Sequence, residues 1–209
     1  MKSQELHSVL IPAENKASRK LMLVLHGLGD SLEGFRFLPH ALQLADLNYL
    51  LVNAPDHYFG GYSWYSYPHS ASSGPEIARS RELLFKLLDQ QREAGFESGN
   101  TFLFGFSQGC LMTLEAGLRY PHKLGGCIGV SGYAHDADQL IKEQSPVAKE
   151  QRFLLTHGSL DDVVPHDRTE RQVSRLRAAG IQIQWKVFAK PHTIIDAEFP
   201  LFREFVIAQ

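Results

Sequence analysis

The stretch "LFGFSQGCLM" (Leu103–Met112) places a short polar turn between two apolar runs. The run before the turn indicates a buried strand, and the run after it indicates a helix. The turn itself, Gly105–Gly109, fits the pattern G-x-S-x-G, in which a serine sits on a sharp strand-to-helix turn. Serine is also a common helix N-cap. Because an N-cap leaves both flanking glycines unexplained, the stretch predicts a nucleophile at Ser107.

Segments with strand and helix patterns alternate along the rest of the chain, with no linker or repeat that would divide it. This alternation predicts an α/β fold with a mainly parallel sheet and helices on both faces, formed by a single domain over residues 1–209. The expected strands cover residues 21–27, 49–55, 100–106, 124–132, 152–158 and 181–189, with an antiparallel edge strand at 7–12. The expected helices cover residues 37–45, 75–95, 108–120, 166–180 and 194–208, the last interrupted near Pro200. A long loop is expected from Asp56 to about Gly74.

The composition of the 209 residues is that of an ordinary globular protein, with 44% apolar and 21% charged residues. The formal net charge is -2 and the charges are interleaved, which argues against a nucleic-acid partner. No apolar run reaches the roughly 18–20 residues of a membrane span, so we expect no integral membrane association. The first eleven residues do not resemble a signal peptide. Together with two cysteines in apolar segments, this predicts a cytoplasmic protein.

A serine nucleophile needs a general base and an acid that orients the base. In this kind of fold the chain order is serine, acid, histidine. "RFLLTHGSLDDVVP" places Asp161 and Asp162 after one expected strand, and "WKVFAKPHTII" places His192 after the next. The residue pattern alone leaves the two aspartates as alternatives. No histidine spacing matches a metal motif, so no metal site is expected.

The oxyanion of acyl transfer must be held by N–H donors. The backbone N–H of Gln108 follows the nucleophile and is the first expected donor. "HGLGDS" follows the first buried strand, and its glycines allow the N–H of Leu28 to face the serine. Gly-Leu-Gly here also resembles the start of a dinucleotide-binding turn. That alternative is weak because Leu32 occupies the third glycine position and Asn53 replaces the expected acidic residue.

Aromatic residues are concentrated in the expected loop after the second buried strand, where Trp64 and Tyr65 are candidate lining residues of a substrate pocket. Simple packing of a long loop explains them equally well. The segment from Gly132 to Arg152 has room for a helix or two. It has no room for a large lid domain, so we expect an open groove.

The motifs "HGLGD", "GFSQG", "SGY" and "HGSLDDVVP", with a late loop histidine, resemble the acyl-protein thioesterase / bacterial carboxylesterase (lysophospholipase-like) family of α/β-hydrolases. The resemblance extends from about Leu21 to the C-terminus. It implies an α/β-hydrolase fold, no cofactor, and a homodimer in several members. It also implies that Ser107 is the nucleophile, Asp161 rather than Asp162 the acid, and His192 the base. The oxyanion donors that it implies are the backbone N–H groups of Leu28 and Gln108.

The family hydrolyses carboxylic esters, and some members cleave thioesters of lipidated proteins or lysophospholipids. The expected function is therefore that of a serine hydrolase acting on a small-molecule or lipid-like ester or thioester. A lipid-directed enzyme and a small-ester carboxylesterase remain alternatives, and a non-catalytic binding protein with this fold is a more remote one. This chain departs from the family at Ser66, where an aspartate often follows the aromatic pair, and at Cys110, where glycine is usual.

Overall fold

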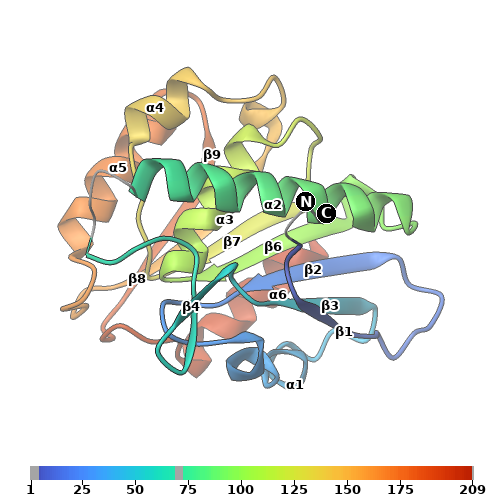
Figure 1. The fold of residues 1–209 in the computed structure, drawn as a ribbon. Helices are drawn as coiled ribbons and strands as arrows, with labels where there is room; N and C mark the ends of the chain where they lie inside the picture. Colours follow the sequence, from blue (N-terminus) through green and yellow to red (C-terminus); the bar gives the residue numbers. More distant parts are fainter. Residues whose placement is uncertain (1–4, 69–72, 209) are drawn as a thin grey trace.

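A seven-stranded sheet runs through the centre of the computed structural model, which describes residues 5–68 and 73–208 (Figure 1). The strand order is β1-β3-β2-β6-β7-β8-β9. β1 pairs antiparallel with β3, and the other neighbouring pairs are parallel. The strands are β1 (Ser8–Ile11), β2 (Lys20–Leu25), β3 (Leu47–Val52), β6 (Thr101–Phe106), β7 (Gly126–Val130), β8 (Arg152–Gly158) and β9 (Gln182–Phe188).

Helices cover both faces of the sheet and enclose two separate apolar cores (Figure 1). Side chains alternate along β2, so that Leu21, Leu23 and Leu25 enter one core while Met22 and Val24 enter the other. The first core lies under α2 (Ser73–Glu93), α3 (Gln108–Arg119), α4 (Ala137–Lys142) and α5 (His166–Ala178), and the second under η1 (Leu32–Phe35), α1 (Leu38–Leu42) and α6 (Phe199–Ile207). Three more short 3-10 turns are η2 (Ser98–Asn100), η3 (Ala148–Glu150) and η4 (Asp196–Glu198). The expected α/β layering is confirmed.

Two expectations about local structure are corrected. The segment expected as a loop contains a hairpin, β4 (Asp56–Tyr58) and β5 (Gly61–Ser63), while residues 69–72 of that segment lie outside the described part of the chain. The hairpin turn uses a positive φ of 49° at Phe59, followed by glycine, which the composition of the segment did not reveal. The last expected helix is shorter than 194–208 and is divided next to Pro200, where the 3-10 turn η4 gives way to α6 at Phe199. Pro200 lies in the first turn of α6, where its missing N–H has no helical partner to lose.

The turn from β6 to α3 is a place of very close backbone contact. Ser107 has φ 54° and ψ -114°, a conformation that a residue with a side chain adopts only at a cost. A Cβ on Gly105 would overlap the carbonyl of Gly109, and a Cβ on Gly109 would overlap the carbonyl of Leu25 in β2. Glycine at both positions therefore lets α3 descend directly onto the sheet.

The loop between β9 and η4 is anchored by a buried ion pair. The Nζ of Lys190 lies 2.7 Å from each carboxylate oxygen of Glu198 and donates to the carbonyl of Thr193 at 2.7 Å. Glu198 also accepts from the Thr156 hydroxyl at 2.5 Å and from the Ile195 N–H at 2.9 Å. The two charged side chains are 1% and 0% exposed. Their pairing joins the two ends of the loop that carries His192.

Replacing Lys190 with methionine should destabilise the protein strongly, because the Glu198 carboxylate would remain buried without its cation. We expect the free energy of unfolding to fall by about 3–5 kcal/mol, measured by urea denaturation. The double variant Lys190→Met/Glu198→Gln removes both charges and should recover most of that loss. A single variant as stable as the parent protein would show that the pair does not anchor the loop.

Candidate active site

An open cleft of about 550 Å³ lies at the carboxyl ends of the parallel strands. This is the edge at which α/β sheets carry ligand sites. Its walls come from loops that follow β2, β6, β7, β8 and β9 and from the segment after the β4–β5 hairpin. The lining residues are Gly27, Leu28, Asp30, Tyr65, Tyr67, Pro68, Phe106, Ser107, Gln108, Tyr133, Val163, Val164, Pro165, Arg168 and His192.

Three residues from distant parts of the chain form a continuous hydrogen-bonded row in this cleft. The Nε2 of His192 lies 3.0 Å from the Oγ of Ser107. On the other side of the ring, its Nδ1 lies 2.8 Å from the Oδ2 of Asp161. The imidazole is 15% exposed, whereas the Asp161 carboxylate is fully buried. The structure thus brings together the serine, histidine and aspartate singled out in the sequence.

The two neighbouring aspartates occupy different environments. The Oδ1 of Asp161 accepts hydrogen bonds from the N–H groups of Val163 (3.0 Å) and Val164 (2.8 Å), which leaves Oδ2 directed at His192. Asp162 is exposed to solvent. His157, in the strand below, has its Nε2 2.9 Å from the Val164 carbonyl. Burial lowers the pKa of His157, so a neutral imidazole supports the acid loop.

Two backbone N–H groups beside Ser107 have no acceptor among the described residues. They belong to Leu28, in the loop after β2, and to Gln108, the first residue of α3. Both residues line the cleft with Ser107. The N–H of Gln108 is also at a helix N-terminus, where the unpaired donors and the helix dipole favour negative charge.

His26 supports the loop that carries Leu28, a role that the sequence analysis missed. Its Nδ1 lies 2.6 Å from the Gly27 carbonyl, and its Nε2 accepts the Ala54 N–H at 3.1 Å. This pair of contacts requires the neutral ring with the proton on Nδ1, and burial lowers its pKa accordingly. A polar residue directly after a wholly apolar strand is the signal that could have identified it.

The two aromatic candidates for the substrate pocket have different positions. Tyr65 lines the cleft, but Trp64 does not, which corrects its assignment. The indole of Trp64 is fully buried, and its N–H donates to the His26 carbonyl at 2.9 Å. The side chain of Gln108 holds both residues in place, because its Oε1 accepts from the backbone N–H of Trp64 and its Nε2 donates to the backbone carbonyl of Tyr65.

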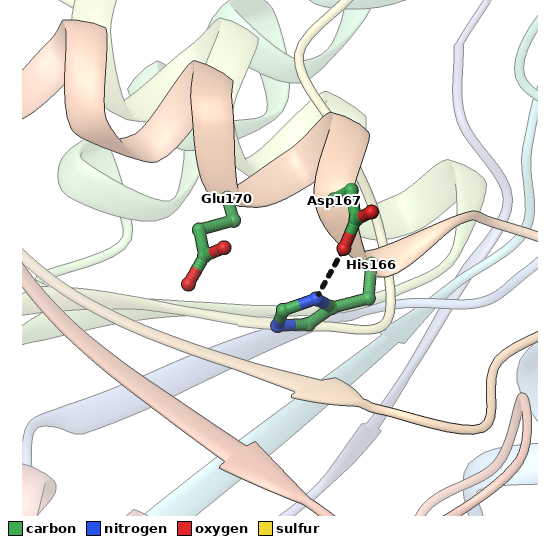
Figure 2. A group of neighbouring side chains, drawn as sticks. All are labelled: His166, Asp167 and Glu170. Carbon is green, nitrogen blue, oxygen red and sulfur yellow. Dashed lines mark hydrogen bonds and ion pairs between the residues drawn. The ribbon is translucent and has the colours of Figure 1, made fainter.

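A group of side chains that could ligate a metal lies at the start of α5, outside the cleft lining (Figure 2). It consists of His166, Asp167 and Glu170, whose ligand atoms lie within 4.8 Å of one another. The Nδ1 of His166 is 3.2 Å from Asp167. Because an acidic residue in the first helical turn is favoured by the helix dipole, Asp167 has a structural explanation.

The alternative of a dinucleotide-binding turn does not fit the structure. The β4–β5 hairpin packs against the loop after β2, where the Gly29 N–H donates to the Tyr62 carbonyl and the Tyr62 N–H donates to the Asp30 carbonyl. The loop leads into the short turn η1, rather than a long helix whose N-terminus could hold a pyrophosphate.

The helices of the described residues include none with the length and apolar character that a membrane span requires.

The chain is similar to known proteins over almost its full length. Residues 6–208 match the family model for phospholipase/carboxylesterase. Acyl-protein thioesterase 1 of Schizosaccharomyces pombe is 33% identical over 174 residues, which cover 77% of this chain and 76% of that protein. A probable carboxylesterase of Oryza sativa subsp. japonica is 28% identical over 202 residues, which cover 88% and 86%.

Solved structures agree with this assignment. The crystal structure of esterase PE8 superimposes with a TM-score of 0.87 at 28% identity and covers 98% of this chain and 99% of its own. The expected fold class is therefore confirmed as that of the α/β-hydrolases, with the Ser107 turn at the end of a central strand. The protein belongs to the phospholipase/carboxylesterase family of α/β-hydrolases.

Proposed function

We propose that this protein is a serine hydrolase that cleaves carboxylic esters or acyl thioesters through an acyl-enzyme formed on Ser107. The observation that carries the proposal is the hydrogen-bonded row of Ser107, His192 and Asp161 next to two backbone N–H groups that have no acceptor in the described part of the chain. Each component meets a requirement of acyl transfer, namely a nucleophile, a base, an orienting acid and an oxyanion site.

The reaction follows from this geometry. The Oγ of Ser107 attacks the acyl carbon while its proton passes to the Nε2 of His192. The N–H groups of Leu28 and Gln108 stabilise the negative charge on the carbonyl oxygen. The bond to the alcohol or thiol then breaks, and the leaving group takes the proton from Nε2. Water repeats the sequence on the acyl-enzyme and releases the carboxylic acid, while Asp161 keeps the imidazole in one tautomer.

The proposed substrates are carboxylic esters and acyl thioesters. The relatives include proteins named acyl-protein thioesterase and others named carboxylesterase, so the proposal covers both kinds of bond. An open cleft of about 550 Å³ has room for a moderately long acyl chain. The lipid-directed alternative is compatible with the same site.

We also propose a cytoplasmic location for the protein. Both cysteines are free and buried, which fits a reducing compartment.

Cys110 is not a second nucleophile in this proposal. It lies one turn into α3 behind Ser107, and burial raises the pKa of its thiol to about 12. A thiol that stays protonated at neutral pH is unreactive. Cys110 is therefore unreactive in the folded protein and does not compete with Ser107 as a nucleophile.

Replacing Ser107 with alanine should lower kcat for para-nitrophenyl butyrate by about 10⁴-fold or more, because the acyl-enzyme cannot form. The same loss is expected for an acylated peptide thioester. Labelling the parent protein with a fluorophosphonate and mapping the adduct provides a direct check. Modification at another residue, or hydrolysis that survives the substitution, would contradict the proposal. An unchanged far-ultraviolet circular dichroism spectrum controls for folding.

The two neighbouring aspartates offer a matched comparison. Asp161→Asn should lower kcat by about 10⁴-fold, because an amide in place of the carboxylate favours the wrong tautomer of His192. Asp162→Asn removes the same charge one residue away and should leave kcat within about twofold, as expected of an exposed position. Equal losses in the two variants would refute the assignment of Asp161.

Cys110 should resist iodoacetamide at pH 8 in the folded protein and react after unfolding in guanidinium, as followed by mass spectrometry. Cys110→Ala should keep esterase kcat/KM within about threefold, since the thiol takes no part in the reaction. Rapid alkylation of the native protein at Cys110 would show that the thiol is accessible and would overturn this expectation.

A further inference from the structure

One wall of the cleft contains two tyrosines joined through their hydroxyls and an arginine that lies over one of the rings. The hydroxyls of Tyr65 and Tyr133 are 3.1 Å apart, and their side chains are almost entirely buried. The guanidinium carbon of Arg168 lies 4.5 Å from the centre of the Tyr133 ring. Because the ring is fixed in the core, the stacking holds the guanidinium in a defined place at the surface of the cleft.

The guanidinium of Arg168 forms no ion pair or hydrogen bond with the part of the chain that the structure describes. Most arginines of this chain donate to a carboxylate, a backbone carbonyl or a histidine ring. Among the described residues, the guanidinium groups of Arg168 and Arg171 alone have no hydrogen bond or ion pair. Arg168 lines the cleft and Arg171 does not. An unpaired cation therefore stands in the same cavity as Ser107.

The position of Arg168 is tied to the proposed acid. Its backbone N–H donates to the Pro165 carbonyl at 3.2 Å, and Pro165 and Val164 both line the cleft. The N–H of Val164 is one of the two donors to Asp161. The first turn of α5 thus connects Arg168 rigidly to the loop that orients His192, and a group bound to Arg168 would have a fixed position relative to Ser107.

A guanidinium that stacks through its face keeps the N–H groups on its edge for other partners. These groups form a planar fork that matches a carboxylate or a phosphate. Among the described residues that line the cleft, Arg168 is the sole lysine or arginine. Asp30, the carboxylate in the lining, forms no ion pair with Arg168 and accepts the Ser31 N–H at 2.7 Å.

We propose that Arg168 binds an anionic group of the substrate, so that this hydrolase prefers esters or thioesters that carry a carboxylate or a phosphate. This inference rests on the proposed function and specifies its substrate class. The anion belongs either to the acyl part, as in a dicarboxylic acid half-ester, or to the alcohol part, as in a glycerol phosphate ester. Arg168 selects the substrate by charge, and the Ser107 row carries out the same reaction on it.

The test compares two pairs of esters that differ in one charge. The acyl pair is the para-nitrophenyl half-ester of adipic acid and its methyl-capped neutral counterpart. The alcohol pair is butyrylglycerol phosphate and butyrylglycerol, with acid release followed by pH-stat. For at least one pair, we expect kcat/KM of the parent protein to favour the anionic member by about tenfold or more, chiefly through KM. The preference should shrink as sodium chloride is raised.

Arg168→Gln should abolish this preference, because kcat/KM for the anionic esters should fall to about the level of their neutral counterparts. Arg168→Lys keeps the charge without the planar fork, so it should retain part of the preference. Arg171→Gln is the matched control, because it removes an equally unpaired arginine from the same helix outside the cleft, and it should keep the parent preference in full.

The outcomes distinguish a failure of anion binding at Arg168 from a failure of the proposed hydrolase function. A preference in the acyl pair or in the alcohol pair that depends on Arg168 supports the proposal and identifies the part that carries the anion. Equal rates on charged and neutral esters overturn it while the hydrolase remains. A loss in Arg168→Gln that is the same for charged and neutral esters also overturns it. No Ser107-dependent hydrolysis of any ester would instead reject the proposed function.

Discussion

The close crossing of β6 and α3 is the constraint on which the site depends. At Gly105 and Gly109 there is space for a hydrogen atom and for nothing larger, because the carbonyls of Gly109 and Leu25 fill the place of a Cβ. The chain can turn this sharply only if Ser107 takes a positive φ, which costs energy for a residue with a side chain. The whole of α3 up to Leu118 is buried, and that burial offsets the cost. The core thereby holds the strained serine at the sheet edge, with its hydroxyl in the cleft.

The other parts of the site reach Ser107 through loops, and each loop is held by a polar contact buried beneath it. His26 fixes the loop of Leu28, and the amide of Gln108 fixes the segment of Tyr65 that follows β5. The ion pair of Lys190 and Glu198 fixes the loop of His192. A buried polar group left without its partner costs far more than the pair contributes when intact. Such contacts therefore add little net stability but penalise every alternative loop conformation, which is what a preorganised site requires.

The chain's local patterns were sufficient to predict the strands, most helices and the residues that meet in the cleft. Continuous apolar runs and the G-x-S-x-G turn are local signals, and strand ends in a parallel sheet converge at one edge. The errors have a common origin. The pattern around Trp64 suggests a pocket residue, because an aromatic residue in a loop gives no sign of the acceptor that its indole N–H will find. The burial of Lys190 has no local signal, because its partner Glu198 lies in the following turn and burial depends on the whole fold. Arg168 was missed because the orientation of a helix relative to the cleft cannot be read from its own residues.

Cys110, where the family resemblance in the sequence implies glycine, fits because the neighbouring strand and the residues after it supply the space for its side chain. Its Sγ lies where a Cβ on Gly129 would be, and both Cβ and Sγ of Cys110 occupy the corresponding space at Gly132. A side chain at position 110 is therefore possible only because β7 and the residues after it supply glycine there. The thiol fills this buried space without needing a hydrogen-bond partner. A serine in its place would bury a hydroxyl that needs one. The departure thus lies in packing behind the nucleophile, while the chemistry of the cleft is set by the residues in front of it.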